Sequence, residues 1–434
     1  MSLKDKASYI FKPSRYKSGT AYAFRGGDLT ALRSSTGTRV NASGNIESVA
    51  SGTPRLNYNP ADLTKEPWVL YEKASTNYCP RSYNFAGWVN YASSLTLNAA
   101  DSPFPGLSAA YISGTTDFYI NCGVLGAEVI DSIYVKAAGA NYFMMSFGYP
   151  GTQDVVFNLS TGLVHSTNGS NISGLAPIDA GNGWWRLSIK GTPAGSTTYH
   201  QHHSCNTNGQ SGKVPGAYIF GAQTEVVASA GAAPTSLIIT DGSSVTRAAD
   251  TLYANSISSS IGSGQGVVYC DFYGQPGATG SYENMFSINS GSFSHSINVF
   301  KSSGGSFYFE IYTAGSNFTS YFYNSSTTTN YRTKMAVYYA NSDFGLYING
   351  VKVFSYGAGT APTGMSSINF SAPAGGYPGT KDIYEFLLFK ERLSDAELAS
   401  LTSFDDYEEL VDIKGLTWES STITNNRLSE LAAL

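Results

Sequence analysis

A short histidine-rich run is the first feature of this sequence that could bind a metal: His200-Gln201-His202-His203, with Cys205 close behind. Histidine and cysteine side chains are common zinc ligands. Neighbouring residues of a strand point to opposite faces, so His200 and His202 could share an ion, whereas His202 and His203 could not. A polar edge strand or loop is the default interpretation. We therefore predict no metal and keep His200 and His202 as the candidate ligands.

Carboxylate pairs are the second kind of chemistry to consider, because glycoside hydrolases place two Asp or Glu side chains roughly 5–10 Å apart in a cleft. The acids of the second half of the chain are sparse: Asp271, Glu283, Glu310, Asp343, Asp382 and Glu385. Asp382 and Glu385 differ in parity along one expected strand, so they would face opposite sides. The sequence has no nucleophile elbow, phosphate-binding loop, dinucleotide fingerprint or HExxH motif. We predict that the chain is not an enzyme.

Aromatic side chains are the more informative candidates, because the CH faces of sugars stack on partly exposed Tyr and Trp rings. In consecutive strand positions, one of Trp184 and Trp185 should face the core and the other the surface or an interface, and Arg186 should share a face with Trp184. Core packing is the alternative role for each ring. The candidate glycan-binding residues are Trp88, Trp184, Trp185, Arg186, Tyr338 and Tyr377.

The composition predicts an all-β protein of two or three domains, since 434 residues are too many for one ordinary domain. Only 13% of the residues are charged, about half the usual share, and the chain contains 46 Gly, 31 Tyr and 23 Phe. Such a composition is typical of short strands joined by many turns. The hydrophobic content of 42% excludes a disordered chain.

Charge and hydropathy exclude several classes of protein. The net charge is −5 without a long basic run, so we expect no nucleic-acid partner. No stretch of about 18 apolar residues is present, so we expect no membrane insertion. The N-terminus lacks the apolar region of a secretory signal. The four cysteines are widely spaced, and we expect them to be free thiols.

Apolar runs separated by turn residues predict two β-sandwiches in tandem. The first spans residues 73–247, with strand-like runs such as 132–136 and 184–189. The second spans residues 248–401, with strands such as 306–312 and a hairpin at 344–353 that turns on Asn349-Gly350. After the closing strand at 382–389, Ser394 and Glu397 have the spacing of a helix capping box.

Both ends of the chain differ from these sandwiches. Residues 1–72 are short of core residues, so we expect them to pack against a partner or against sister chains. A tight hairpin is predicted within residues 38–58, where Val40, Ile46 and Val49 are apolar and the turn is Asn41-Ala42-Ser43-Gly44-Asn45. Residues 402–434 form an acidic stretch and a short C-terminal helix with leucines on one face, which we interpret as a docking tail.

Several segments resemble one family of proteins. TRVNASGNIESVASGTPRLNY resembles a segment near the N-terminus of many tailed-phage virion proteins. STNYCPRSYNFAGWVN, SIYVKAAG, VVFNLSTGLV, GNGWWRLSI, YIFGAQTE and PTSLIITDGSSVTRAAD resemble, in order, a carbohydrate-binding-module-like jelly roll of phage fibres. The family usually has Asn-Leu where this chain has Asn77-Tyr78. YINGVKV together with RLSDAEL resembles the concanavalin A-like (laminin-G-like) sandwich.

The resemblance implies a tail fibre, head fibre or spike. Residues 1–72 would anchor the chain to other virion proteins, and the sandwiches would contact host surface polysaccharide without cutting it. A homotrimer is implied by analogy, as is assembly in the bacterial cytoplasm with release by lysis. No cofactor is implied, although calcium is compatible with such folds. Two alternatives stay open: a structural or decoration protein without a receptor, and a polysaccharide depolymerase.

Overall fold

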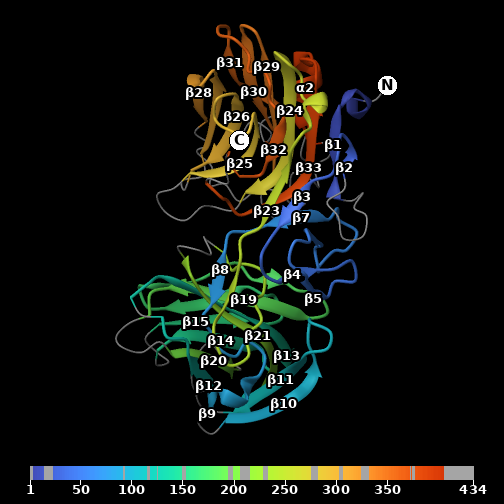
Figure 1. The fold of residues 1–434 in the computed structure, drawn as a ribbon. Coiled ribbons are helices and arrows are strands. Elements are labelled where there is room, and N and C mark those ends of the chain that lie inside the picture. Colours follow the sequence, from blue (N-terminus) through green and yellow to red (C-terminus); the bar gives the residue numbers. More distant parts are fainter. Residues whose placement is uncertain are drawn as a thin grey trace, which may run out of the picture.

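The computed structural model describes residues 3–13, 23–90, 93–114, 118–124, 126–148, 153–193, 199–205, 216–227, 233–274, 282–302, 306–323, 332–371, 373 and 377–404. It confirms the expected fold class, since antiparallel sheets form two β-sandwiches that lie one above the other in Figure 1. The expected docking tail lies almost entirely outside the described residues, as does its terminal helix. No helix of the described ranges is long and apolar enough to cross a membrane.

The first sandwich is the lower body in Figure 1 and consists of two sheets. One sheet has the order β10 (Ser93–Asp101), β11 (Ser108–Gly114), β21 (Gly216–Val226), β13 (Val129–Ala138), β19 (Trp184–Gly191) and β17 (Ile172–Gly174), with β18 (Ile178–Asp179) beside β19. The facing sheet has the order β16 (Val164–Asn168), β15 (Asp154–Asn158), β14 (Tyr142–Phe147), β20 (Tyr199–Cys205), β12 (Phe118–Asn121) and β9 (Val89–Asn90). Ile133 and Leu187 of one sheet share a buried core with Phe143 and Phe157 of the other.

The second sandwich is the upper body. Its first sheet has the order β2 (Ala23–Arg25), β1 (Tyr9–Phe11), β33 (Lys381–Phe389), β24 (Gln265–Gly274), β29 (Arg332–Ala340), β30 (Asp343–Ile348) and β31 (Val351–Tyr356), with β7 (Trp68–Tyr71) on β33 and β6 (Arg55–Asn57) on β7. Its second sheet has the order β28 (Ser316–Tyr323), β27 (Phe307–Thr313), β26 (Ser296–Lys301), β25 (Glu283–Asn289), β32 (Ser367–Asn369), β23 (Thr251–Ala254) and β3 (Thr30–Leu32). Alternate residues of both sheets meet in one core, as strands buried on one face require.

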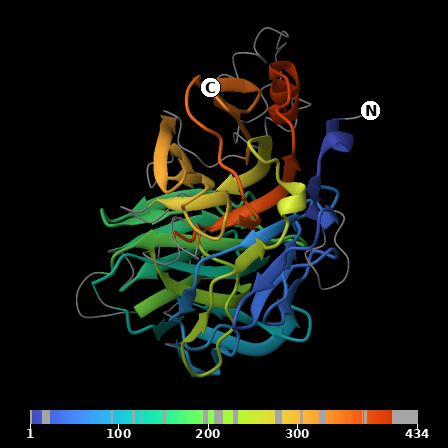
Figure 2. The same cartoon turned by 45° about the horizontal axis from the view of Figure 1, so that its top comes forward.

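The N-terminal segment is divided between the two sandwiches. Strands β1 and β7 both pair with β33, and Figure 2 shows the blue N-terminal strands beside the red C-terminal ones. Tyr9, Phe11 and Tyr71 thereby enter the core of the second sandwich. We expected residues 1–72 to pack against a partner or sister chains; their described strands pair instead with strands of the same chain. Their role as a virion anchor stays a prediction.

The predicted hairpin forms as β4 (Gly37–Val40) and β5 (Ile46–Val49), paired in antiparallel register. The side-chain oxygen of Asn41 accepts hydrogen bonds from the backbone N–H groups of Ser43 and Asn45, which closes the turn. Ile46 is buried against the first sandwich, where it packs with Tyr134 and Leu237. The hairpin therefore lies on the outer face of the sheet that contains β13 and β19.

Two further local features agree with the sequence patterns. The helix α2 (Asp395–Thr402) begins with a full capping box, in which the Ser394 hydroxyl accepts from the Glu397 N–H and the Glu397 carboxylate accepts from the Ser394 N–H. The hairpin of β30 and β31 turns on Asn349 and Gly350, both with positive φ. Short 3-10 turns lie at Leu3–Lys6, Phe85–Gly87 and Ser258–Ser260.

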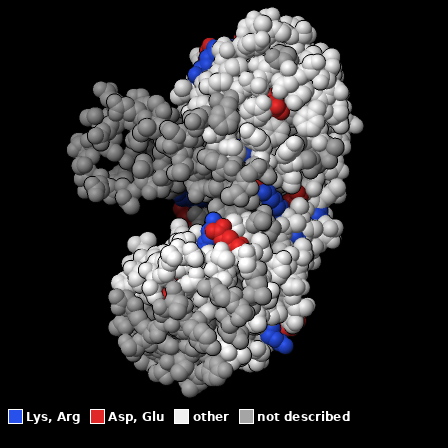
Figure 3. Space-filling model, turned by 90° about the vertical axis from the view of Figure 1, so that its left-hand side faces the viewer, with Lys and Arg blue, Asp and Glu red and all other residues white. Residues whose placement is uncertain are grey.

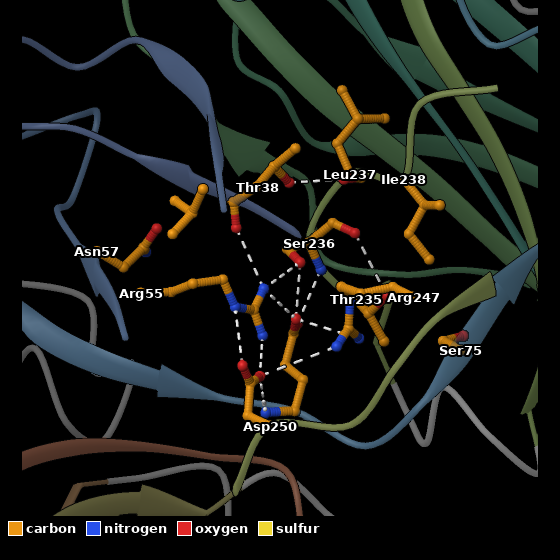
Figure 4. Close-up of polar contacts among 12 residues, drawn as sticks. Thr38, Arg55, Asn57, Ser75, Thr235, Ser236, Leu237, Ile238, Arg247 and Asp250 are labelled. Atoms are coloured by element: carbon orange, nitrogen blue, oxygen red, sulfur yellow. Dashed lines mark hydrogen bonds and ion pairs between the residues drawn. The ribbon is translucent and has the colours of Figure 1, made fainter. Parts of the chain in front are cut away.

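Buried charges join the two sandwiches where the chain crosses between them, through a two-stranded ribbon of β8 (Ser75–Asn77) and β22 (Val245–Arg247). We call Arg33, Arg55, Glu72, Arg247 and Asp250 the junction network; Figure 4 labels Arg55, Arg247 and Asp250. Arg55 Nη1 lies 2.8 Å from Glu72 Oε2, and Arg33 Nη1 lies 2.9 Å from Asp250 Oδ1. Arg247 Nη2 lies 3.2 Å from Glu72 Oε2. This pairing offsets the free-energy cost of burying each charge without a partner of opposite sign.

The arginines of the junction network hold the Glu72 carboxylate in its charged form. Burial by itself would raise the pKa of Glu72, but Arg247, Arg55 and hydrogen bonds from Ser236 lower that pKa to about 2. Arg55 also donates from Nη1 to the Thr38 carbonyl at 3.1 Å and to the Ser236 hydroxyl at 2.6 Å. One side chain thus ties the hairpin, the end of the first sandwich and the crossing segment together.

Candidate functional site

A pocket of about 370 Å³ opens on the outer face of the second sheet of the second sandwich. We call it the aromatic pocket. Its lining consists of six aromatic side chains and one carboxylate: Tyr282, Phe293, Phe300, Tyr308, Glu310, Tyr312 and Tyr377. Its volume falls within the range of small-ligand pockets. Figure 3 views the molecule from the side on which β28 lies in Figure 1, and few charged residues appear on the upper body there.

Strand β27 builds the centre of the aromatic pocket because successive side chains of a strand alternate between faces. Phe307, Phe309 and Ile311 point into the core and are buried. Tyr308, Glu310 and Tyr312 occupy the other face and are only partly buried. A strand with apolar residues at every second position thus presents a Tyr-Glu-Tyr row to solvent.

Neighbouring elements bring the remaining rings to this row. Phe300 of β26 lies opposite Tyr308 in the sheet register, and the two ring centroids are 6.3 Å apart. Tyr282 packs on Tyr308 at 5.6 Å, and Tyr377 meets Phe300 edge-on at 5.7 Å. The four rings therefore form a continuous wall along one side of the aromatic pocket. Such tilted and edge-on contacts are the favoured geometries of aromatic pairs.

The opposite wall is a second aromatic pair. Phe293, from the loop between β25 and β26, meets Tyr312 edge-on at 5.6 Å. Tyr282 and Tyr377 are 45% and 54% exposed, which is unusual for aromatic side chains of this size. The rim of the aromatic pocket is therefore open to a ligand, while Phe300 forms a buried base.

Glu310 is the single carboxylate among the described residues that line the aromatic pocket. Asn317 Nδ2 on the adjacent strand β28 donates to its Oε1 at 3.3 Å. Burial raises the pKa of Glu310 above its ordinary value, and hydrogen bonds from Tyr308 and Tyr312 offset this shift only in part. The carboxylate is thus held among rings with hydrogen-bond donors around it, in a place where its charged form is poorly solvated.

Polar side chains continue the outer face of the same sheet beside the aromatic pocket. The Ser287 hydroxyl donates to Asn298 Oδ1 at 2.8 Å, and Asn298 Nδ2 donates to the Ser296 hydroxyl at 2.9 Å. Asn289 Nδ2 donates to the Ser287 hydroxyl at 3.1 Å. These residues are buried, and Asn298 lies opposite Glu310 in the register. A satisfied polar network of this kind fixes the shape of the sheet beneath the site.

Of the residues that the sequence singled out, Tyr377 lies in the aromatic pocket. Its φ of +50° places a non-glycine residue in the left-handed region, a conformation that often accompanies functional sites. Its carbonyl accepts a hydrogen bond of 2.8 Å from the Asn284 N–H of β25, which fixes the loop to the sheet. The other lining residues were not among our candidates, although the alternation in 306–312 contained the signal for Tyr308, Glu310 and Tyr312.

Two other candidates are core residues. Trp88 is 5% exposed, stacks on Phe118 at 4.9 Å, and donates from Nε1 to the Arg81 carbonyl at 3.1 Å. Tyr338 is fully buried in β29 beneath Arg392, whose guanidinium carbon lies 4.0 Å from the ring centroid. Neither ring has a free face for a sugar as placed, because neighbouring side chains already cover it.

The Trp184-Trp185-Arg186 row behaves as the strand alternation predicts. Trp184 and Arg186 are buried on the face that the hairpin covers, where Trp184 packs with Ile46. Arg186 donates to the Thr235 carbonyl at 2.7 Å and to the Ser132 hydroxyl at 3.1 Å. Both residues therefore pack in an internal interface between the hairpin and the first sandwich, where Arg186 also lines a pocket of about 370 Å³.

Trp185 points to the opposite face and is partly exposed. Its Nε1 donates to the Leu159 carbonyl at 3.0 Å, and its ring lies over Gly162. The ring borders a shallow groove of about 760 Å³, whose lining also includes Lys136, Asp179 and Asn182. This groove is a second place where a sugar could stack, on the first sandwich rather than the second.

The histidine run lies in β20, which pairs with β14 and β12. His200 is opposite Phe147, and His202 is opposite Met145. Their side chains lie outside the described part of the chain, so the prediction that they could share a metal is untested. Within the described residues, no three His, Cys, Asp or Glu side chains gather as metal ligands.

Comparisons with known proteins give only partial likenesses. No family model and no curated protein matches the sequence. Among solved structures, a CBM40 module of the Ruminococcus gnavus IT-sialidase, bound to alpha2,3 sialyllactose, aligns with 33% of this chain and 84% of the module, at 16% identity and a TM-score of 0.29. A mutant NanB sialidase from Streptococcus pneumoniae aligns with 34% of this chain at 17% identity and a TM-score of 0.29, spanning 26% of the sialidase. The receptor binding domain of a botulinum neurotoxin of mosaic serotype C/D aligns with 35% of this chain and 39% of that domain, at 15% identity and a TM-score of 0.28.

Proposed function

We propose that this chain binds host surface glycans non-covalently as a fibre or spike component of a tailed-phage virion. The observation that carries the binding role is the aromatic pocket: six rings around one carboxylate, with Tyr282 and Tyr377 open at the rim. Partly exposed Tyr rings offer an apolar face to sugar CH groups and a hydroxyl for hydrogen bonds. The Trp185 groove on the first sandwich would add a second contact.

The virion role rests on the sequence resemblance of residues 38–58 and of the segments between residues 75 and 250. In this proposal the protein is assembled in the host cytoplasm and released by lysis. It docks on other virion proteins through its N-terminal segment and forms a homotrimer. Three copies would present each weak pocket three times, and repeated weak sites gain avidity without any new contact.

Binding without cleavage is part of the proposal. Glycoside hydrolysis needs two carboxyl groups about 5–10 Å apart. Glu310 is the single carboxyl group in the described lining of the aromatic pocket. The Trp185 groove contains Asp62 and Asp179 at a shallow, open surface, where water would surround any sugar bond. These arrangements favour a lectin-like site over a depolymerase.

The test is a glycan array probed with the full-length chain, since β1 and β7 pair with β33 and a chain starting at residue 73 would lack them. We expect binding to bacterial polysaccharides that Tyr308→Leu weakens and Tyr356→Leu, on the exposed strand β31, leaves unchanged. Reducing-end assays on the same glycans should detect no cleavage. A blank array would instead support a structural or decoration protein without a receptor.

A further inference from the structure

The arrangement of charge within the aromatic pocket points to a specific ligand chemistry. Tyr308 and Tyr312 flank Glu310 at two positions on either side along β27, a spacing of about 7 Å in each direction. A cation is attracted to an aromatic face when it lies within about 6 Å of the ring centroid. A positive group above Glu310 would therefore meet the carboxylate directly and lie between the rings of Tyr308 and Tyr312, whose hydroxyls hydrogen-bond to that carboxylate.

No basic side chain of this chain occupies that position among the described residues that line the aromatic pocket. Lys301 follows Phe300 along β26 but lies opposite Phe307, on the core side of the sheet, where its ammonium group donates to the Gly274 carbonyl. On the side of β28, the contact to Glu310 is the neutral amide of Asn317. The groups that face Glu310 are thus uncharged: two phenols and an amide.

A neutral sugar would not require this carboxylate. Burying a carboxylate among rings without a counter-ion is costly, and burial raises the pKa of Glu310 accordingly. An ammonium ion offsets that cost by direct charge pairing, and the surrounding rings add cation–π attraction. Cages of aromatic rings are a known way to recognise quaternary ammonium ions.

We propose that the aromatic pocket binds an ammonium group carried by a surface glycan, either the free amine of an amino sugar or a quaternary ammonium substituent. This inference rests on the proposed glycan-binding function and adds the charge of the recognised group. It makes Glu310 the residue that selects charged over neutral saccharides, with Tyr308 and Tyr312 as the rings that hold the cation.

Choline is the sharpest probe, because its quaternary ammonium does not titrate and any pH dependence of its binding reports on the protein. Titration calorimetry or ligand-observed NMR with the full chain should show choline binding that weakens as the pH falls through the raised pKa of Glu310. At neutral pH, Glu310→Gln should weaken binding about tenfold, equivalent to about 1.4 kcal/mol. The matched control is Glu391→Gln, which removes the same charge at an exposed position and should change nothing.

Two saccharide probes distinguish the sources of the ammonium group and the two levels of the proposal. A glucosamine oligomer should bind more tightly than the N-acetylglucosamine oligomer of the same length, and Glu310→Gln should remove the difference. Choline binding without amino-sugar binding would assign a quaternary substituent. Equal binding of both oligomers, unaffected by Glu310→Gln, would overturn the ammonium inference and leave glycan binding intact. Failure of all three probes, with an empty glycan array, would overturn both.

Discussion

Arg55 offers the strongest test of what holds the two sandwiches together. Its side chain is fully buried and reaches Glu72 Oε2 at 2.8 Å, the Ser236 hydroxyl at 2.6 Å and the Thr38 carbonyl at 3.1 Å, besides pairing with Asp250. Replacing Arg55 by Met keeps much of the side-chain volume but removes every one of these donors. We expect a large loss of stability, since the acceptors cannot turn to water.

The magnitude follows from what remains in place. Removing one partner of a buried ion pair costs about 3–5 kcal/mol because the other charge is left uncompensated. In this variant Glu72 still forms an ion pair with Arg247 at 3.2 Å, and Asp250 still forms one with Arg33 at 2.9 Å. Each carboxylate therefore retains one charged partner. We therefore expect the lower end of the range, about 3 kcal/mol. That is a large part of the roughly 5–15 kcal/mol that stabilises a typical folded protein.

The assay is denaturant unfolding followed by tryptophan fluorescence, with the midpoint and slope fitted for each transition. The matched control is Arg39→Met, which breaks the 2.7 Å ion pair to Glu47 on the partly exposed hairpin. Exposed pairs contribute less than about 1 kcal/mol, so this variant should behave almost as the wild type. If Arg55→Met costs no more than Arg39→Met, the junction network does not stabilise the protein and our reasoning fails.

Three further predictions concern pH, a helix cap and a glycine. Folding lowers the pKa of Glu72 from 4.5 to about 2, so its contribution is complete above pH 4.5 and is lost as the pH falls through about 2; Glu72→Gln should flatten this part of the stability–pH curve, and an unchanged curve would contradict the assignment. Ser394→Ala should lower the free energy of unfolding by about 1 kcal/mol, measured as a lower Tm, because it removes the N-cap of α2. Ser394→Asp should retain most of this stability, since an Asp side chain can also cap the helix. Gly162→Ala places a Cβ 2.4 Å from the Trp185 ring, at a φ of +72°, and should therefore lower Tm and shift the Trp fluorescence. The control is Gly52→Ala, at the same φ but with open space around it, which should show only the backbone cost of about 1–2 kcal/mol. If the two Ala variants lower Tm equally, the predicted clash between the new Cβ at position 162 and the Trp185 ring is wrong.

Local patterns in the sequence predicted the parts of the fold that depend on neighbouring residues. The hairpin turn at Asn41, the Asn349-Gly350 turn and the capping box at Ser394 and Glu397 all form as their residue types require. Each depends on interactions within a few residues, so the sequence contains the whole signal. The same holds for the opposite faces of Trp184 and Trp185, which follow from strand alternation alone.

What the sequence could not predict depends on strand order. β1 pairs with β33 across more than 370 residues, and three-residue strands are too short to reveal a partner from their own pattern. The burial of Trp88 and Tyr338 likewise depends on elements that fold over them from elsewhere. In the aromatic pocket, alternation along β27 identifies its central row, but Tyr282 and Tyr377 join it only through the sheet register and the loop before β33.

The ribbon of β8 and β22 has a consequence for how the chain folds. Because these strands lie side by side, residues 75–247 leave the second sandwich and return to it at one point, as an inserted domain. That domain can close as soon as it is synthesised, whereas β1 and β7 must wait for β33, the last strand of the described residues. Contacts over such separations form slowly. We expect the inserted sandwich to fold first and the outer one, with its aromatic pocket, to be completed only after β33 has been synthesised.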